Sequence, residues 1–526
     1  MDIKTIKSME EATVQSQSGF ARIAIAFLFI AAVYIWCSIT HTDVANNSFL
    51  IIGAVFGAYM AMNIGANDVA NNVGPAVGSK ALTMMGAIVI AAIFEASGAL
   101  IAGGDVVKTI KKGIIDPGMF TDPEIFVWAM TAALLSAAIW LNLATAIGAP
   151  VSTTHSIVGG VMGAGIAAAG FAIVSWGTMG KIAASWIISP VLGGLIAAGF
   201  LLFIKKSIYF KDDMLSNAKK TVPLLIAIMT WAFSTYIIVK GIKKLIKVDF
   251  LVAFGVGLVI AVAVYLLVKP LIEKAASKLE NNRESVNTLF TIPLIFAAAL
   301  LSFAHGANDV ANAIGPLAAI NDAVIGGGIS SKVEIPLWVM AVGAVGIAIG
   351  LALFGPKLIK TVGSEITELD QARAFAIALA ASITVIIASQ LGLPVSSTHI
   401  AVGGVFGVGF LREYLYNTEA NLLKETKKKF KKDKAELEKL QEEFEKLDAN
   451  KAKTKDDYQR IVELYRLIDD TKDLVKDEKK DYKSVTKIKY VKRDAVKKIV
   501  ASWIITVPAA AILSACVFFM IKGIMS

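Results

Sequence analysis

Cysteine and histidine are scarce in this chain: its 526 residues include two cysteines and four histidines. Both cysteines, Cys37 and Cys516, lie inside apolar runs. We therefore expect small buried hydrophobic side chains at both positions, and the two cysteines imply neither a disulfide framework nor a metal site. The histidines show no ligand spacing typical of zinc or another transition metal. The N-terminal residues 1–19 are polar and lack the apolar core and cleavage site of a signal peptide, so this segment is expected to stay attached.

Charge is also sparse over most of the chain, and long apolar runs take its place. Hydrophobic residues make up 56% of the sequence, charged residues 18%, and the mean hydropathy is +0.65. Many runs approach the roughly 20 residues that cross a bilayer as a helix, and several are short or interrupted by Gly and Pro. The sequence predicts an all-α polytopic membrane protein of the cell (inner or plasma) membrane, with about 12 transmembrane helices, some broken or re-entrant. Lys and Arg on cytoplasmic loops explain the net charge of +10, so no nucleic-acid partner is expected.

The chain contains an internal duplication. Three motifs occur twice in the same order, and the first two start 85 residues apart in the first copy and 88 apart in the second. The pairs are GANDVANNVGPAV (65–77) with GANDVANAIGPLA (306–318), PVSTTH (150–155) with PVSSTH (394–399), and ASWIISP (184–190) with ASWIITVP (501–508). The first GAND motif lies in the second apolar run and the other in the ninth. An odd number of crossings separates them, so the sequence predicts two inverted-topology repeats with the substrate at their interface near the membrane midplane.

One charged insertion interrupts the second repeat. The segment between the second and third motifs is 73 residues longer there, and residues 411–498 carry 26 basic and 20 acidic side chains. Apolar residues recur at spacings of three and four over 437–447 and 458–468, which predicts a soluble helical hairpin. Its positive balance favours the cytoplasm. A solvated coiled coil is the simpler interpretation, and a regulatory or dimer-contact role is the alternative.

These landmarks divide the chain into six predicted segments. They are 1–45 (N-terminal tail and first transmembrane helix), 46–205 (first repeat), 206–285 (connecting transmembrane helices), 286–411 (first part of the second repeat), 412–495 (charged hairpin) and 496–526 (end of the second repeat).

The first motif places acidic residues inside apolar segments at matching positions of both repeats: Asn67-Asp68 and Asn308-Asp309. An intramembrane Asp is costly and normally has a partner. The Gly-Pro pair that follows in each motif is expected to loosen the helix and free carbonyl oxygens. Asp, Asn and carbonyl oxygens suit a small hard cation such as sodium. Structural, hydrogen-bonded Asp residues are the alternative.

The second motif is typical of a helix start. Proline fits the first helical position, and Ser or Thr hydroxyls cap free amides there. Such a start offers N–H donors and a positive dipole to an anion such as phosphate. The candidate phosphate-binding hydroxyls are those of Ser152, Thr153, Thr154, Ser396, Ser397 and Thr398. The glycine pairs that follow, 159–160 and 403–404, permit close helix packing. Ordinary capping and packing are the alternative.

Other polar residues lie within these apolar segments. For His155, His305 and His399 we expect structural hydrogen bonds; His155 and His399 are equivalent in the two repeats, whereas His305 corresponds to Ile64. Glu95 is a further intramembrane carboxylate. Ion or proton coupling is the favoured role of Glu95, and a structural pair with Lys108 or a similar group is the alternative.

The two GANDVAN segments and the two PVS(T/S)TH segments resemble the inorganic phosphate transporter (PiT) family, whose members include sodium- and proton-coupled phosphate symporters. The resemblance covers nearly the whole chain apart from 1–45 and the insertion. It implies sodium coordination by Asn67, Asp68, Asn308 and Asp309, phosphate binding by the Ser and Thr residues of the second motif, and a functional role for Glu95. It also implies a homodimer in the lipid bilayer, with sodium as the co-transported ion and no other cofactor. Some animal relatives carry a second glutamate where this chain has Ala378.

The resemblance predicts a secondary symporter that imports inorganic phosphate with sodium by alternating access. Three alternatives remain open. A proton-coupled permease for phosphate or another oxyanion would use the same motifs. A passive anion channel is disfavoured because sequestered carboxylates repel an anion unless cations enter with it. An intramembrane hydrolase would use Ser152 and His155, but the sequence shows no groups that would stabilise an oxyanion, so no enzymatic activity is expected.

Overall fold

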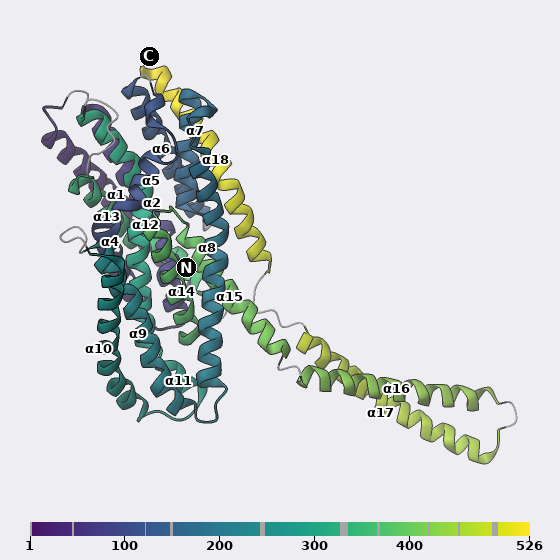
Figure 1. Ribbon diagram of the computed structural model, residues 1–526. Coiled ribbons are helices and arrows are strands. Elements are labelled where there is room, and N and C mark those ends of the chain that lie inside the picture. Colours follow the sequence, from purple (N-terminus) through teal and green to yellow (C-terminus); the bar gives the residue numbers. More distant parts are fainter. Residues whose placement is uncertain are drawn as a thin grey trace. The chain divides into compact units, whose positions relative to one another are not determined.

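The computed structural model describes residues 3–44, 47–120, 122–147, 151–241, 248–326, 335–365, 369–418, 421–450, 453–486 and 493–525. Within these ranges the regular structure is helical, apart from an isolated β-bridge between Ile115 and Val174. The chain divides into two compact units, a bundle (Met1–Val408 with Arg493–Ser526) and a hairpin (Gly409–Lys492). Figure 1 shows the helices of each unit.

The bundle takes most of the helices. Its first part contains α1 (Ile3–Thr40), α2 (Asn47–Asn67), α3 (Val69–Gly78), α4 (Met84–Ala102), α5 (Gly104–Lys112), η1 (Pro117–Met119), α6 (Pro123–Ile147), α7 (Thr153–Ala169), η2 (Phe171–Ile173), α8 (Trp176–Ile204), η3 (Lys205–Tyr209) and α9 (Met214–Lys240). Its second part contains α10 (Phe250–Ala276), α11 (Arg283–Thr288), α12 (Thr291–Ile325), α13 (Leu337–Glu365), α14 (Gln371–Gln390), the first half of α15 (Ser397–Thr418), which belongs to the bundle up to Val408, and α18 (Arg493–Met525).

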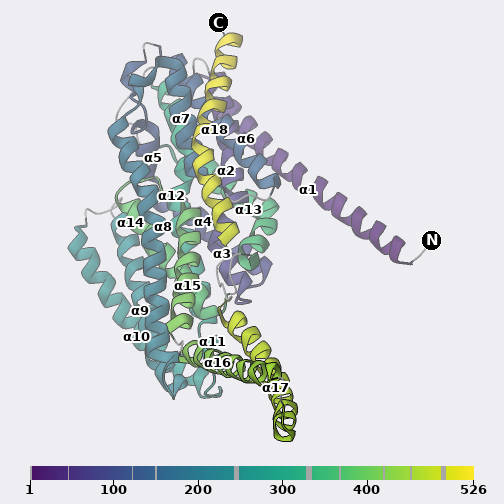
Figure 2. The ribbon, with the colours of Figure 1, turned by 90° about the vertical axis from the view of Figure 1, so that its right-hand side faces the viewer.

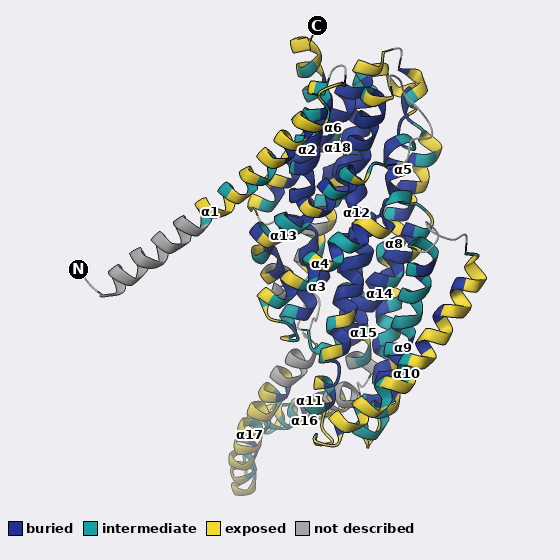
Figure 3. Cartoon of the chain, turned by 90° about the vertical axis from the view of Figure 1, so that its left-hand side faces the viewer, coloured by how far each residue is buried: buried dark blue, intermediate teal, exposed yellow. Residues whose placement is uncertain are grey.

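The bundle is that of a multi-pass membrane protein. Eleven helical stretches of the described part are long and apolar enough to cross a membrane, close to the predicted dozen. Large apolar side chains such as Leu251, Val259 and Leu267 of α10 point outward and are more than two-thirds exposed, as a bilayer rather than water would require. The helices α2, α6, α12 and α14 are mostly buried, as Figure 3 shows. These four helices therefore form the centre of the bundle.

The glycines that follow the second motif allow α7 and α15 to pack closely on neighbouring helices, as predicted. A Cβ on Gly159 would lie 2.6 Å from the Val507 oxygen of α18, and one on Gly403 would lie 2.3 Å from the Pro190 oxygen of α8. The helix α7 of the first repeat thus packs on the end of the second, and α15 of the second repeat packs on α8 of the first. Each repeat therefore contributes a helix that packs on the other repeat, and neither repeat has a complete hydrophobic core by itself.

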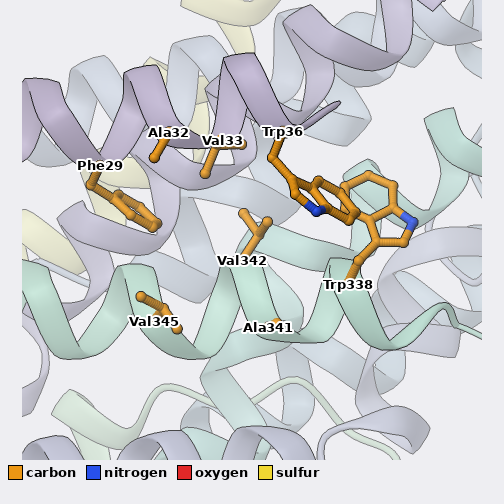
Figure 4. A pocket seen from close by; sticks show the side chains of 8 residues that line it. All are labelled: Phe29, Ala32, Val33, Trp36, Trp338, Ala341, Val342 and Val345. Atoms are coloured by element: carbon orange, nitrogen blue, oxygen red, sulfur yellow. The ribbon is translucent and has the colours of Figure 1, made fainter. Parts of the chain in front are cut away.

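An apolar groove of about 380 Å³ lies between α1 and α13. Trp36 and Trp338 meet at one end of it, with ring centroids 5.4 Å apart (Figure 4). The other lining residues are Phe29, Ala32, Val33, Ala341, Val342 and Val345. None of the eight lining residues belongs to the duplicated motifs, so the groove is separate from the candidate site.

The hairpin consists of α16 (Asn421–Ala449) and α17 (Lys455–Thr486), which lie side by side (Figure 2). Glu443 of α16 accepts a 3.0 Å hydrogen bond from Arg460 of α17. At the start of α17, Asp457 accepts hydrogen bonds from the backbone N–H (2.7 Å) and hydroxyl (2.8 Å) of Thr454. These bonds stabilise the carboxylate and hold the pKa of Asp457 below its ordinary value. The predicted helical hairpin is confirmed.

Candidate functional site

The first motif takes different backbone forms in the two repeats. A break at Asp68 separates α2 from α3, whereas α12 runs through Asp309 without interruption. Both the N–H and the side-chain amide of Asn71 donate to the Asp68 carbonyl oxygen at 3.0 Å, which tightens the turn there. The equivalent Asn312 donates instead to hydroxyls of α7. The Gly-Pro pairs 74–75 and 315–316 both lie inside continuous helix, in α3 and α12, so the break at Asp68 is not the loosening that was expected at these pairs.

The two aspartates meet at the centre of the bundle. Asp68 accepts hydrogen bonds from the hydroxyls of Thr153 (2.5 Å) and Thr398 (3.1 Å). Asp309 accepts one from Ser397 (3.2 Å), and the Thr153 hydroxyl lies 3.4 Å from it. A carboxylate oxygen of each aspartate and a ring nitrogen of His305 lie within 4.8 Å of one another. Residues from both motifs of both repeats thus form one buried polar cluster.

Asn67 and Asn308 hold equivalent places beside this cluster. Asn67 hydrogen-bonds the Thr145 hydroxyl over 2.9 Å. Asn308 donates to the Ser389 hydroxyl over 2.9 Å and accepts from the backbone N–H of Val395 over 3.3 Å. Asn308 therefore holds the segment that leads into α15, and Asn67 holds the end of α6. Thr145 and Ser389 were not identified from the sequence, although both lie five residues before the proline of the second motif.

Ser152 and Ser396 cap α7 and α15. The Ser152 hydroxyl accepts from the N–H of His155 (3.1 Å), and the Ser396 hydroxyl accepts from the N–H of His399 (3.2 Å). Proline was predicted at the first helical position, but α15 begins three residues after Pro394. The reason is that the hydroxyl of the capping serine defines the first turn. Pro150 lies outside the described residues. The hydroxyl of Ser152 is engaged with the backbone rather than with the His155 ring.

Two further asparagines, Asn71 and Asn312, belong to the site. Asn71 donates to the Thr398 hydroxyl (2.9 Å), and Asn312 donates to those of Thr153 and Thr154 (3.1 Å each). Each amide thus spans from one repeat to the other. Their repetition in the GANDVAN motif was the sequence signal for this role.

Several buried oxygen atoms of the cluster have no hydrogen-bond donor among the described residues. They are the side-chain carbonyl oxygens of Asn71 and Asn312 and one carboxylate oxygen of Asp309. All three side chains are at most 1% exposed. A buried oxygen without a donor is costly unless a cation or water takes that place. Oxygen ligands of this kind fit a hard cation.

Glu95 enters the cluster through His305. One carboxylate oxygen of Glu95 lies 2.6 Å from Nδ1 of His305, and the other accepts a 2.7 Å hydrogen bond from the Asn72 amide. Nε2 of His305 lies 3.1 Å from Asp309. The alternative that Glu95 pairs with Lys108 is wrong, because Lys108 lies on the exposed side of α5 and pairs with Asp105.

His155 and His399 take part in ring contacts. Their centroids lie 4.5 Å apart, Trp186 lies 3.8 Å from His155, and Trp503 stacks at 3.6 Å on His399. Within the described part of the chain, neither ring nitrogen of His399 has a hydrogen-bond partner. The expectation of a structural hydrogen bond for His399 is therefore wrong, because aromatic rings surround its imidazole. The structural hydrogen bond expected for His305 is present.

All eleven candidate residues are at most 2% exposed: Asn67, Asp68, Glu95, Ser152, Thr153, Thr154, Asn308, Asp309, Ser396, Ser397 and Thr398. The Thr154 hydroxyl donates to the backbone oxygen of Val395 over 2.9 Å. This bond joins the N-terminal ends of α7 and α15. The structure brings both sets of candidate residues to one place.

Comparisons with known proteins show which family the chain resembles. Residues 64–514 match the family described as "Phosphate transporter family". A Helicobacter pylori protein described as "Putative phosphate permease" is 51% identical over 533 aligned positions, covering 98% of both chains. A Thermococcus kodakarensis protein with the same designation is 42% identical over 69% of this chain and 89% of its own. A solved structure described as "The sodium-dependent phosphate transporter" superposes with a TM-score of 0.73 at 32% identity, over 90% of this chain and 99% of that one.

Proposed function

The chain belongs to the phosphate transporter family, and from this membership and the buried cluster we propose that it imports inorganic phosphate together with sodium ions by alternating access. One observation supports the sodium assignment. Oxygen atoms of Asn71, Asn312 and Asp309 have no hydrogen-bond donor in the part of the chain that the structure describes, and the carboxylates of Asp68 and Asp309 lie close together. Two carboxylates so close in a low-dielectric interior need compensating positive charge. Sodium ions supply that charge, and the structural neighbour is described as dependent on the same ion.

The proposed coupling follows from the hydroxyl groups that the aspartates engage. Thr153, Ser397 and Thr398 donate their hydroxyl hydrogens to Asp68 or Asp309. A hydroxyl has one hydrogen, so it cannot serve a carboxylate and a phosphate oxygen together. A sodium ion on the carboxylates satisfies them and frees the hydroxyls to turn toward phosphate. Phosphate is then held well only when sodium is present, which is the requirement of a symporter.

Phosphate is proposed to lie between the N-terminal ends of α7 and α15. Helix N-termini favour anions through free N–H groups and the helix dipole. The six hydroxyls of Ser152, Thr153, Thr154, Ser396, Ser397 and Thr398 surround these ends. Closing one helix end or the other to solvent would give access from alternate sides of the membrane.

Uptake of radiolabelled phosphate into proteoliposomes tests the proposal. Sodium, lithium and proton gradients are imposed separately, and phosphate should accumulate above its external concentration only with inward sodium. Accumulation that collapses when a sodium ionophore is added also distinguishes symport from a passive anion channel. Accumulation driven by a pH gradient and indifferent to sodium would contradict sodium coupling.

A proton-coupled permease is the second candidate. The observation that favours it is the buried imidazole of His305 between Glu95 and Asp309, since a His–carboxylate pair can hold a proton. The gradient experiment separates the two ions directly.

The hairpin is proposed to lie in the cytoplasm, because its basic surplus follows the positive-inside tendency. A cysteine placed at the exposed Lys439 should react with an impermeant maleimide in inverted vesicles and not in intact cells; the reverse would contradict this orientation. The homodimer implied by the family resemblance is likewise a proposal, which mass photometry of the purified protein in nanodiscs would test.

A further inference from the structure

The duplication allows each site residue to be compared with its counterpart in the other repeat. Alignment of the GAND motifs pairs His305 with Ile64 and Asn72 with Ala313. The counterpart of Glu95 follows from helix packing. A Cβ on Gly98 of α4 would lie 1.9 Å from the Phe303 oxygen of α12, and a Cβ on Gly350 of α13 would lie 1.9 Å from the Met62 oxygen of α2.

These two crossings are equivalent. Phe303 and Met62 each lie three residues before the motif glycine, Gly306 or Gly65. A Cβ on Gly306 would lie 2.1 Å from the Glu95 oxygen, and one on Gly65 would lie 1.9 Å from the Ile347 oxygen. Glu95 in one repeat therefore corresponds to Ile347 in the other.

Three polar residues, which form a triad, have three apolar residues as their counterparts. Asn72, Glu95 and His305 are joined by contacts of 2.7 Å and 2.6 Å. Their counterparts are Ala313, Ile347 and Ile64, which are all fully buried. The GANDVAN segment itself, 65–71 and 306–312, is identical in the two repeats. The residues next to the carboxylates nevertheless differ, as do the backbone forms at Asp68 and Asp309.

The two aspartates are held differently as a result. Nε2 of His305 lies 3.1 Å from Asp309, and the imidazole is itself held by Glu95. The side chain of the equivalent Ile64 offers the Asp68 carboxylate no polar atom. That carboxylate accepts hydrogen bonds from the rotatable hydroxyls of Thr153 and Thr398, and the Asn67 amide, turned so that its oxygen accepts from Thr145, places its nitrogen 3.3 Å from Asp68. A carboxylate fixed by an anchored partner presents its oxygens in one orientation, and loss of such a partner typically weakens metal binding about 10–100-fold.

We propose that the two cation half-sites are unequal: His305, anchored by Glu95 and Asn72, is a positioning residue that orients Asp309 and not Asp68. The inference rests on the proposed sodium function and specifies how its two half-sites differ. The Asp309 half-site binds its cation more tightly, and the Asp68 half-site binds the cation that exchanges more readily.

Equilibrium binding of radioactive sodium to the full-length protein in nanodiscs, without phosphate, tests this. The Asp68→Asn variant retains the Asp309 half-site, and Asp309→Asn retains the Asp68 half-site. His305→Gln, which keeps a polar side chain beside Glu95, is added to each. We expect the sodium Kd to rise about tenfold or more in the Asp68→Asn background and less than about twofold in the Asp309→Asn background.

Equal shifts in the two backgrounds, or none in either, would overturn the inference, because a merely structural effect of His305 acts on both half-sites alike. A triple change, Asn72→Ala with Glu95→Ile and His305→Ile, copies the apolar triad and leaves no unpaired buried charge. It provides a second variant with the same expectation, should His305→Gln fail to fold. A wild-type protein that binds no sodium would instead refute the proposed function, so the two failures are distinguishable.

Discussion

The hydroxyl of Thr398 donates a 3.1 Å hydrogen bond to Asp68, although the two residues are 330 positions apart. The candidate cation ligand of the first repeat is thus held by the candidate anion motif of the second. Thr398 also accepts from Asn71, which strengthens the same connection. The proposed cation at Asp68 would therefore act directly on the start of α15, and the proposed coupling needs no long pathway.

Replacement of Asp68 or Asp309 by asparagine should abolish most sodium-driven uptake. Either change removes a charged ligand at nearly constant shape. The loss of such a buried charged partner costs about 2–5 kcal/mol, which corresponds to uptake at least roughly 30-fold slower at limiting sodium. Proteoliposome uptake measures this, with the exposed loop variant Asp212→Asn as the control. Wild-type sodium dependence in both Asp variants would rule out the cation role.

Gly407→Ala should destabilise the bundle. A Cβ there would lie 2.1 Å from the backbone oxygen of Gly194, and overpacking of this kind costs about 1–3 kcal/mol. The thermal unfolding midpoint of the solubilised protein should fall. Gly199→Ala, in α8, is the matched control and should leave the midpoint unchanged, because its new Cβ would meet no atom of a neighbouring element within 4 Å among the described residues. Equal midpoints for the two variants would contradict the close approach of α8 and α15.

Lys111 and Asp322 form a buried ion pair between α5 and α12. Lys111→Met should destabilise the protein by about 3–5 kcal/mol, because Asp322 is left as an uncompensated buried charge. The double variant Lys111→Met with Asp322→Leu should recover most of this loss, since no charge is then buried. Unfolding midpoints measure both. A double variant no more stable than the single one would show that the pair is not the source of the effect.

Deletion of residues 415–492, closed by a short flexible linker, should preserve transport. The hairpin forms a compact unit with its own contacts, including the Arg460–Glu443 pair and the packed rings of Phe444 and Tyr465. Uptake by the inserted deletion variant is the measurement. Complete loss of uptake in a protein that inserts normally would mean that the hairpin contributes to the transport cycle.

Much of the site could be predicted because the duplication repeats the same residue types at the same spacing. Asp68 and Asp309 were identified in this way. The break at Asp68 could not be predicted, because Asp309 has nearly the same neighbours in sequence and the difference arises from where the amides of Asn71 and Asn312 point. Local sequence does not encode that choice; packing against the other repeat does.

The partner of Glu95 could not be predicted from the sequence either. His305 lies 210 positions away and reaches Glu95 only because α4 and α12 cross at Gly98 and Gly306. The mismatch of His305 with Ile64 in the aligned motifs was nevertheless visible, and such a mismatch within a duplicated site is a usable signal. The ring contacts of His155 and His399 depend on the exchange of helices between repeats, which no single motif reveals.

Each phosphate is proposed to enter with at least two sodium ions, one for each aspartate. One tenfold sodium gradient supplies about 1.4 kcal/mol per ion. With two ions and monovalent phosphate, a potential of 100 mV adds about 2.3 kcal/mol, for a total near 5 kcal/mol. Two-ion coupling could therefore concentrate phosphate roughly a thousandfold or more.

Simultaneous measurement of radioactive sodium and phosphate influx into the same proteoliposomes, at a clamped inside-negative potential, tests this coupling most directly. We expect a flux ratio of at least two sodium ions per phosphate, a Hill coefficient for sodium above one, and faster uptake at a more negative interior. Phosphate accumulation without accompanying sodium influx would contradict two-ion symport.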